Sequence, residues 1–295
     1  IHNFLTRIVS LTLPTSYICN LRCDYCFIRQ MWRKNHVVSN DVILNLGELS
    51  IKHIINYNNK NNKENNISLW GAEPFCNLNL LDKVTDLCIN NGCNVSTSTN
   101  GSIIDGQVIE LLTKMFSNNI LNNIQISLDG PKHVHDKHRK TIDGSGSYDN
   151  IMKFIDILNN ISSNLNINNR LYSFNGTIML NEDTPKIFLD AAKFFTDKNN
   201  KDIYSSFVPV RIESVISYTK KNYEQFIKTI QIFYDFICSV DYPIIDSYTN
   251  NLFNTTERID GLPRCSAMRT ALAVDEDGSL VMCQHPLDNT NLKSI

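Results

Sequence analysis

Three cysteines near the start of the chain are the residues best suited to chemistry. Cys19, Cys23 and Cys26 lie within the eight-residue string CNLRCDYC. Three thiolates at this spacing can bind three irons of a cubane iron–sulfur cluster, whose irons are normally held by four cysteines. The fourth iron then keeps an open coordination position, which is typical of a reactive site. The spacing therefore predicts a [4Fe–4S] cluster with room for a small molecule.

Zinc is the main alternative for this triplet. Structural zinc sites take four protein ligands, and three soft thiolates leave such a site incomplete. The nearest downstream candidate for a fourth ligand is His36, ten residues after Cys26. The ligand count therefore favours a cluster, with a zinc site as the second interpretation.

The overall composition limits the class of protein. The chain has 295 residues, a formal charge of -2 and 42% hydrophobic residues, enough for a substantial core. This balance gives no electrostatic reason to expect nucleic acid or a membrane surface as a partner. Nine cysteines, an odd number, do not resemble a disulfide framework, so we expect a reduced, cytoplasmic protein. Because the first residue is Ile, we also expect a trimmed or partial sequence. Only a few residues precede the first predicted strand, so we expect no separate leader-binding domain upstream in this chain.

Short β-rich runs alternate with longer amphipathic stretches. The runs predict strands at 7–13, 66–70, 94–98, 123–127, 171–178 and 203–208. The stretches predict helices near 40–57, 78–91, 105–117, 148–161, 184–197 and 221–240, with Ser39 and Asp105 as N-caps. Such alternation indicates an α/β fold with a parallel sheet, open or curled toward a barrel.

The pattern changes near residue 243. We expect one domain over 1–243 and a small module over 244–295, which begins with a loop-rich stretch and contains a β-hairpin at 272–282. Cys265 and Cys283 flank this hairpin. They could be cluster ligands, zinc ligands or buried core residues, and the loop-rich surroundings disfavour the last.

Polar residues follow the predicted strands at the edge where parallel sheets place their chemistry. Gly71 and Glu73 follow the second strand, Thr97–Asn100 ends the third, and Ser127 and Asp129 end the fourth. Each loop alone also fits an ordinary turn. Together with the cysteines they predict a ligand cleft. Three nearby histidines at 133, 135 and 138 fit a helical metal face poorly, so we interpret them as solvated.

These motifs together resemble the radical S-adenosylmethionine superfamily. CNLRCDYC (19–26) is similar to its CxxxCxxC signature, and GAEP (71–74) to its GGEP element. ISLDGPKHVHDKHR (126–139) and GSGSYDNIMKFI (144–155) resemble the branch that carries a C-terminal SPASM module. The cysteines at 265 and 283 fit the opening of that module. The resemblance implies a partial (β/α)6 TIM-like barrel with a small, truncated SPASM or twitch-like module.

The resemblance also implies roles for individual residues. Cys19, Cys23 and Cys26 would bind the catalytic cluster, and Cys265 and Cys283 would bind an auxiliary cluster. The residues expected to bind S-adenosylmethionine are Tyr25, Gly71, Glu73, Thr99, Asn100, Ser127, Asp129 and Arg139. Of these, Gly71 and Glu73 would hold its ammonium group, and Ser127 and Arg139 its carboxylate.

The implied function is that of a radical enzyme that modifies a peptide or protein. It would cleave S-adenosylmethionine to a 5′-deoxyadenosyl radical with an electron from a partner such as flavodoxin or ferredoxin. The resemblance favours a maturase of ribosomally made peptides that installs a cross-link or a side-chain modification.

Three departures from the family pattern qualify this expectation. Ala72 replaces the second glycine of GGEP, and the chain ends at Ile295, before further module cysteines. Gln284 stands where sulfatase-maturating enzymes carry an aspartate base, which disfavours formylglycine formation. The alternatives are formylglycine formation of the sulfatase-maturating type, a non-catalytic iron–sulfur or zinc protein that binds peptides, and an inactive scaffold relative.

Overall fold

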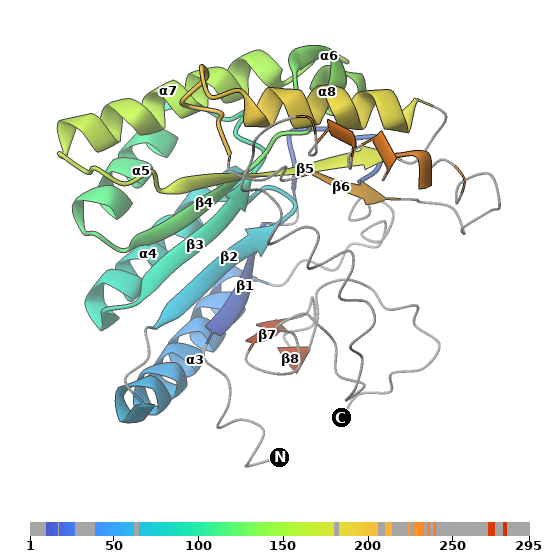
Figure 1. The fold of residues 1–295 in the computed structure, drawn as a ribbon. Coiled ribbons are helices and arrows are strands. Elements are labelled where there is room, and N and C mark those ends of the chain that lie inside the picture. Colours follow the sequence, from blue (N-terminus) through green and yellow to red (C-terminus); the bar gives the residue numbers. More distant parts are fainter. Residues whose placement is uncertain are drawn as a thin grey trace, which may run out of the picture.

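The fold is described from a computed structural model. It describes residues 10–16, 18–26, 39–61, 65–179, 183–205 and 210–213, part of the stretch 224–239, and residues 271–274 and 280–281. Within these residues the chain forms one sheet with helices packed along it (Figure 1).

The sheet has eight strands in the spatial order β6-β5-β4-β3-β2-β1-β7-β8. The first six strands are parallel and adjacent in chain order, as in part of a (β/α) barrel. Their bounds are β1 Ser10–Ser16, β2 Asn66–Gly71, β3 Asn94–Thr99, β4 Leu121–Ser127, β5 Tyr172–Met179 and β6 Val210–Glu213. Among the described residues β6 and β8 form the two edges, so the sheet is open. Because the strands are parallel, their carboxyl ends share one rim.

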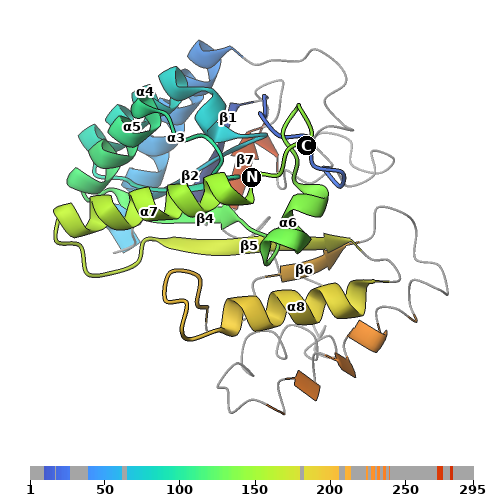
Figure 2. The same ribbon diagram turned by 90° about the horizontal axis from the view of Figure 1, so that it is seen from above.

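Helices connect the strands and lie along the sheet (Figures 1 and 2). The long helices are α3 Asn40–Asn61, α4 Leu78–Asn91, α5 Gly106–Ser117, α7 Tyr148–Asn164 and α8 Thr184–Thr196. Two short elements, the 3-10 helix η1 Pro74–Cys76 and α6 Lys132–His138, follow β2 and β4. Both of them lie at the rim. No helix in the described part of the chain has the length and hydropathy needed to traverse a bilayer.

Side chains at the helix starts explain where α3, α4 and α5 begin. Ser39 Oγ accepts from the Val42 amide at 3.3 Å, and Asp105 Oδ1 accepts from the Val108 amide at 2.9 Å. Both N-caps predicted from the sequence are therefore confirmed. Asn77 caps α4 and also donates to the Thr15 carbonyl at 2.8 Å, which ties this helix to the end of β1.

The core lies between the helices and the sheet. Strands β2 and β3 alternate half-buried and buried residues, which is the period of two expected for a strand. The helices bury residues at helical spacing, for example Val108, Leu111, Leu112, Met115 and Phe116 in α5. Each fully buried side chain of this size contributes about 1.5–3 kcal/mol. This packing holds the carboxyl ends of the strands in place.

The structure confirms most of the predicted elements and corrects one. The expected strand at 203–208 is wrong at its described residues 203–205, which follow α8 as a turn and irregular chain, and the strand β6 lies at Val210–Glu213. Asn200 accepts from the amides of Ile203 and Tyr204, and Ser205 donates to the Phe195 carbonyl. These bonds keep the segment coiled against the end of the helix.

The predicted C-terminal hairpin is present in its described residues. Strand β7, Ala271–Val274, pairs with β8, Leu280–Val281, in antiparallel register. Strand β7 also pairs in parallel with β1, so the hairpin extends the main sheet beside the first strand (Figure 1). The expected boundary at 243/244 lies outside the described residues, as do Cys265, Cys283 and Gln284.

Candidate active site

The cysteine triplet lies in the loop that leaves β1 at the rim. Cys19, Cys23 and Cys26 are all partly buried and all free thiols. The loop is held by the Arg22 amide, which donates to the Lys140 carbonyl at 2.7 Å, and by a bridge between Leu21 and Thr141. The segment after β4 therefore supports the cysteines from one side.

The environment of Cys19 and Cys23 favours the protonated form of their thiols in the absence of a metal. Burial raises the pKa of Cys19 to about 12, and the negative charges of Glu73 and neighbouring cysteines add to this effect. Burial also raises the pKa of Cys23, although the Arg139 guanidinium opposes it. Only a bound metal would make thiolates favourable here, so metal binding must release protons.

The end of β2 requires a residue without a side chain. A Cβ atom on Gly71 would collide with the Ser16 backbone, whose amide nitrogen would lie 2.8 Å away. The Ala72 amide donates to the Ser16 carbonyl at 2.8 Å, and the Glu73 amide to the Ile18 carbonyl at 3.1 Å. These bonds bring the GAEP segment against the start of the cysteine loop.

Glu73 is a deeply buried carboxylate at the rim, only 1% exposed. Its Oε1 accepts from the Thr99 hydroxyl at 2.8 Å and the Phe75 amide at 3.2 Å. Its Oε2 accepts from the Asn100 amide at 2.7 Å. Burial raises the pKa of Glu73 to about 7, although these three hydrogen bonds oppose the shift.

This carboxylate suits an ammonium ligand. Within the described residues no lysine, arginine or histidine forms an ion pair with Glu73. A carboxylate has about four acceptor positions, and protein donors use three of those on Glu73. A buried carboxylate without a cation is costly, and a ligand cation would remove that cost. The residues present therefore fit the amino group that the family resemblance predicts.

A second charged group lies at the ends of β4 and β5. Arg139 Nε donates to both oxygens of Asp129 at 3.0 and 3.1 Å, and both side chains are buried. Asp129 also accepts from the Thr177 amide at 2.8 Å and from the Tyr25 hydroxyl. The Arg139 guanidinium lies 5.4 Å from the centre of the Tyr25 ring. The Asp129 carboxylate thus fixes the arginine through Nε and leaves its terminal nitrogens for another anion.

Burial raises the pKa of Tyr25 well above its usual value, although the positive charge of Arg139 opposes the shift. The phenol therefore stays protonated and acts as a donor to Asp129. For Arg139, burial acts against the charge, but the Asp129 carboxylate more than compensates and the pKa is raised. The guanidinium therefore stays positively charged over the whole pH range in which the protein would work.

His135 supports this pair from behind, a role that the sequence did not predict. Its Nδ1 accepts from the Asp129 amide at 3.3 Å, and its Nε2 lies 2.9 Å from the Ser147 hydroxyl. Ser147 in turn donates to the Arg139 carbonyl at 3.1 Å. Burial lowers the pKa of His135 to about 3, so the ring is neutral, with its proton on Nε2.

The interpretation of the three histidines as solvated is therefore wrong for His135. His133 is exposed and lies 3.4 Å from Asp190, while His138 lies 3.2 Å from Asp24. The three rings have separate partners. In the part of the chain that the structure describes, no three His, Cys, Asp or Glu side chains converge on one metal ion.

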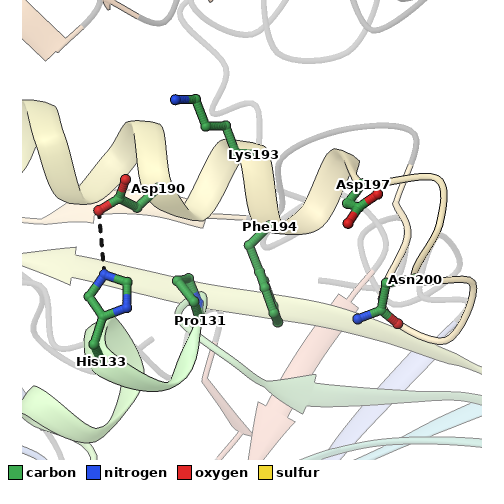
Figure 3. Close-up of a pocket in the computed structure, with 7 residues that line it drawn as sticks. All are labelled: Pro131, His133, Asp190, Lys193, Phe194, Asp197 and Asn200. Atoms are coloured by element: carbon green, nitrogen blue, oxygen red, sulfur yellow. Dashed lines mark hydrogen bonds and ion pairs between the residues drawn. The ribbon is translucent and has the colours of Figure 1, made fainter.

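Two of the surface pockets formed by the described residues involve segments that follow β1 and β4. One, of about 720 Å³, is lined by Asn20, which follows Cys19, and by residues of the 141–153 segment. The other, of about 350 Å³, lies between α6 and α8 (Figure 3). Its lining residues are Pro131, His133, Asp190, Lys193, Phe194, Asp197 and Asn200. Only the first pocket adjoins the cysteine loop.

The structure brings most of the predicted site residues into two hydrogen-bonded groups. The first joins Cys19, Glu73, Thr99 and Asn100, and the second joins Tyr25, Asp129 and Arg139. Ser127 ends β4 with a half-buried side chain, two residues before Asp129. Sequence reasoning missed Asn20, Ser102, His135, Ser147 and Thr177. Asn20, Ser102 and Ser147 look like ordinary turn residues without the fold, and Thr177 contributes through its backbone amide within β5.

Comparison with known proteins relates this geometry to a family. The pattern of the "Radical SAM superfamily" matches residues 13–195. The chain is 28% identical to the "Radical SAM cyclopropyl synthase TigE" of Paramaledivibacter caminithermalis over 94% of its own length and 58% of that protein's. It is 30% identical to the "Cysteine-type anaerobic sulfatase-maturating enzyme" of Clostridium novyi over 74% of its length and 57% of that protein's. The chain thus spans less than two thirds of either relative.

A solved structure shows the same fold. "Native anSMEcpe with bound AdoMet and Cp18Cys peptide" superposes with a TM-score of 0.60 and 21% identity. The match covers 93% of this chain and 73% of that one.

Proposed function

This chain belongs to the radical S-adenosylmethionine superfamily, and we propose that it is an enzyme that removes a hydrogen atom from a peptide or protein substrate. The observation that carries the proposal is a single contact group at the rim. In it, Asn100 joins Cys19 to the buried carboxylate of Glu73, which has no ion-pair partner among the residues that the structure describes. A cluster ligand and an ammonium site are therefore adjacent.

The cofactors that the family uses fit these residues. Cys19, Cys23 and Cys26 would bind a [4Fe–4S] cluster, and Glu73 with the Gly71 backbone would hold the ammonium of S-adenosylmethionine. When bound and reduced, this pair supplies a 5′-deoxyadenosyl radical that can take hydrogen from an unactivated carbon. Arg139 and Ser127 would hold the carboxylate through charge-assisted bonds. Tyr25 and Thr99 would lie along the nucleoside.

The chain's own residues prepare the site before any ligand enters. Because its pKa is raised to about 7, Glu73 is partly protonated near neutral pH in the free site. It would lose this proton when the ligand binds, and the carboxylate would then accept a hydrogen bond from the ammonium group. Asp129 holds Arg139 through Nε, so the terminal nitrogens do not have to be ordered when the ligand binds. The buried surroundings of both groups exclude water and strengthen these contacts.

A peptide is the substrate class that the relatives support best. One relative is named a cyclopropyl synthase, and the structural neighbour contains AdoMet together with a peptide. We therefore propose modification of a ribosomally made peptide, with an electron supplied by a flavodoxin or ferredoxin. An auxiliary cluster at Cys265 and Cys283 would belong to the same proposal.

Formylglycine formation is the second candidate. The 30% identity to a cysteine-type sulfatase-maturating enzyme favours it. Gln284 disfavours it, because an amide cannot accept a substrate proton at neutral pH. Incubation with a sulfatase-derived cysteine peptide and with candidate precursor peptides, followed by mass spectrometry, would distinguish the two activities.

The general proposal can be tested without knowing the substrate. Protein reconstituted anaerobically with iron and sulfide, then given dithionite and S-adenosylmethionine, should release 5′-deoxyadenosine. Cys23→Ala should abolish release, whereas the control Cys76→Ala, a partly buried cysteine outside the triplet, should retain it. Undiminished release from the Cys23 variant would overturn the assignment of the site.

A further inference from the structure

Asn100 contacts both parts of the candidate site. It follows β3 and its side chain is 6% exposed. Its backbone amide donates to Glu73 Oε2 at 2.7 Å, on the ammonium side. Its side-chain Nδ2 lies 3.6 Å from Cys19 Sγ and 2.9 Å from Asn20 Oδ1, on the cluster side. The family resemblance implied only that this residue binds S-adenosylmethionine.

The neighbouring hydrogen bonds fix the orientation of the Asn100 amide. Its Oδ1 accepts from the Ser102 amide at 2.9 Å and from the Ser102 hydroxyl at 2.6 Å. A flipped amide would place a donor against the Ser102 backbone donor and an acceptor against the Asn20 oxygen. The network therefore keeps the NH₂ group directed at the Cys19 sulfur.

The Cys19 sulfur has a second donor besides Asn100. It also accepts from the Leu21 amide at 3.3 Å. Of these two donors, the Asn100 amide group is the one that a side-chain substitution can remove. Hydrogen bonds to the sulfurs are among the factors that set the reduction potential of an iron–sulfur cluster.

We propose that Asn100 is a positioning residue that raises the reduction potential of the cluster by donating a hydrogen bond to the Cys19 sulfur. The inference rests on the proposed function, because it requires the [4Fe–4S] cluster. Reduction adds electron density to the cluster and its thiolates. A donor therefore stabilises the reduced form more than the oxidised form, and its loss makes reduction harder.

The test is an EPR-monitored redox titration of the reconstituted protein without S-adenosylmethionine. Asn100→Ser removes the donor without adding charge, because the hydroxyl is too short to reach the sulfur. Asn100→Asp removes the donor but retains an oxygen for Ser102. We expect the equilibrium constant for one-electron reduction to fall about tenfold in Asn100→Ser, which corresponds to about 59 mV. A larger fall is expected in Asn100→Asp.

Asn20→Asp is the matched control. It adds a negative charge next to Cys19 but retains the acceptor for the Asn100 amide. The inference predicts a potential lower in Asn100→Asp than in Asn20→Asp. It is overturned if Asn100→Ser titrates like the wild type, and equally if the two aspartate variants coincide. If Asn100→Asp takes up no cluster, Asn100→Ser decides.

Failure of the inference can be distinguished from failure of the proposed function. A wild-type protein that assembles no [4Fe–4S] cluster would overturn the proposed function and the inference with it. A wild-type cluster whose potential is unchanged in Asn100→Ser would overturn the inference alone.

Discussion

Asp129→Asn should strongly destabilise the protein, because it removes the negative charge that compensates buried Arg139. The carboxylate is 1% exposed and the arginine 8% exposed, and they are joined by two contacts of 3.0 and 3.1 Å. Breaking a buried pair by removing one partner costs about 3–5 kcal/mol. Asparagine retains one oxygen for the Thr177 amide, so we expect the lower limit of this range.

For a chain of this size, about 3 kcal/mol corresponds to a fall in Tm of about 6–12 °C. The assay is thermal unfolding of the metal-free protein under reducing, anaerobic conditions, followed by circular dichroism. Asp149→Asn is the matched control, because Asp149 pairs with Lys132 on the surface, where both side chains are more than half exposed. Surface ion pairs contribute little, so this variant should unfold like the wild type.

A double variant separates the ion pair from simple loss of packing. Asp129→Asn combined with Arg139→Gln removes both charges, so its destabilisation should be smaller than the sum of the two single effects. The interpretation of the pair as mutually compensating is refuted if Asp129→Asn unfolds with the Asp149→Asn control. Strict additivity of the two single variants would refute it equally.

Three further predictions follow from the same site. Burial raises the pKa of Glu73 from 4.5 to about 7, so the native state retains a proton that the unfolded state loses. As the pH rises from 4.5 to 7, the metal-free wild type should therefore lose about 3 kcal/mol of unfolding free energy relative to Glu73→Gln. Urea unfolding at each pH measures this difference. Parallel pH profiles of the unfolding free energy in the two proteins would contradict the prediction. Burial lowers the pKa of His135 from 6.5 to about 3. Acidification from pH 6.5 toward 3 should therefore destabilise the wild type relative to His135→Gln by about 4 kcal/mol. If the difference in unfolding free energy between the two proteins stays constant over this range, the buried ring is not neutral. Gly71→Ala should weaken S-adenosylmethionine binding at least tenfold, because the added methyl group displaces the Ser16 backbone. Calorimetry measures the Kd. An unchanged Kd would show that the close approach of Gly71 to the Ser16 backbone is not needed for binding.

The sequence predicted the parts of the fold that depend on local patterns. Alternating runs gave β2 and β3 almost to the residue, and the caps at Ser39 and Asp105 gave the helix starts. The clustering of polar residues at the rim followed from one rule, that parallel strands end on the same side. The strand at 203–208 was predicted from the β-branched and aromatic composition of that run. Composition does not reveal that the backbone of residues 203–205 forms hydrogen bonds with Asn200 and with Phe195 near the end of α8.

The partners of the site residues could not be predicted from the sequence in the same way. His133 and His135 are two positions apart, and only the formation of a helix over Lys132–His138 directs them to different sides. The contact between Asn100 and Cys19 joins residues 81 positions apart in the chain. Such contacts depend on how the rim loops pack, which no local pattern records.

The central claim is that the cysteine triplet holds a cluster with one iron open to the amino acid part of S-adenosylmethionine. The most direct measurement is pulsed electron–nuclear double resonance of the reduced cluster, made with S-adenosylmethionine carrying ¹⁵N in its amino group. A resolved ¹⁵N coupling is predicted in the wild type and in Cys76→Ala. A reduced cluster that shows no such coupling at saturating S-adenosylmethionine would contradict the claim.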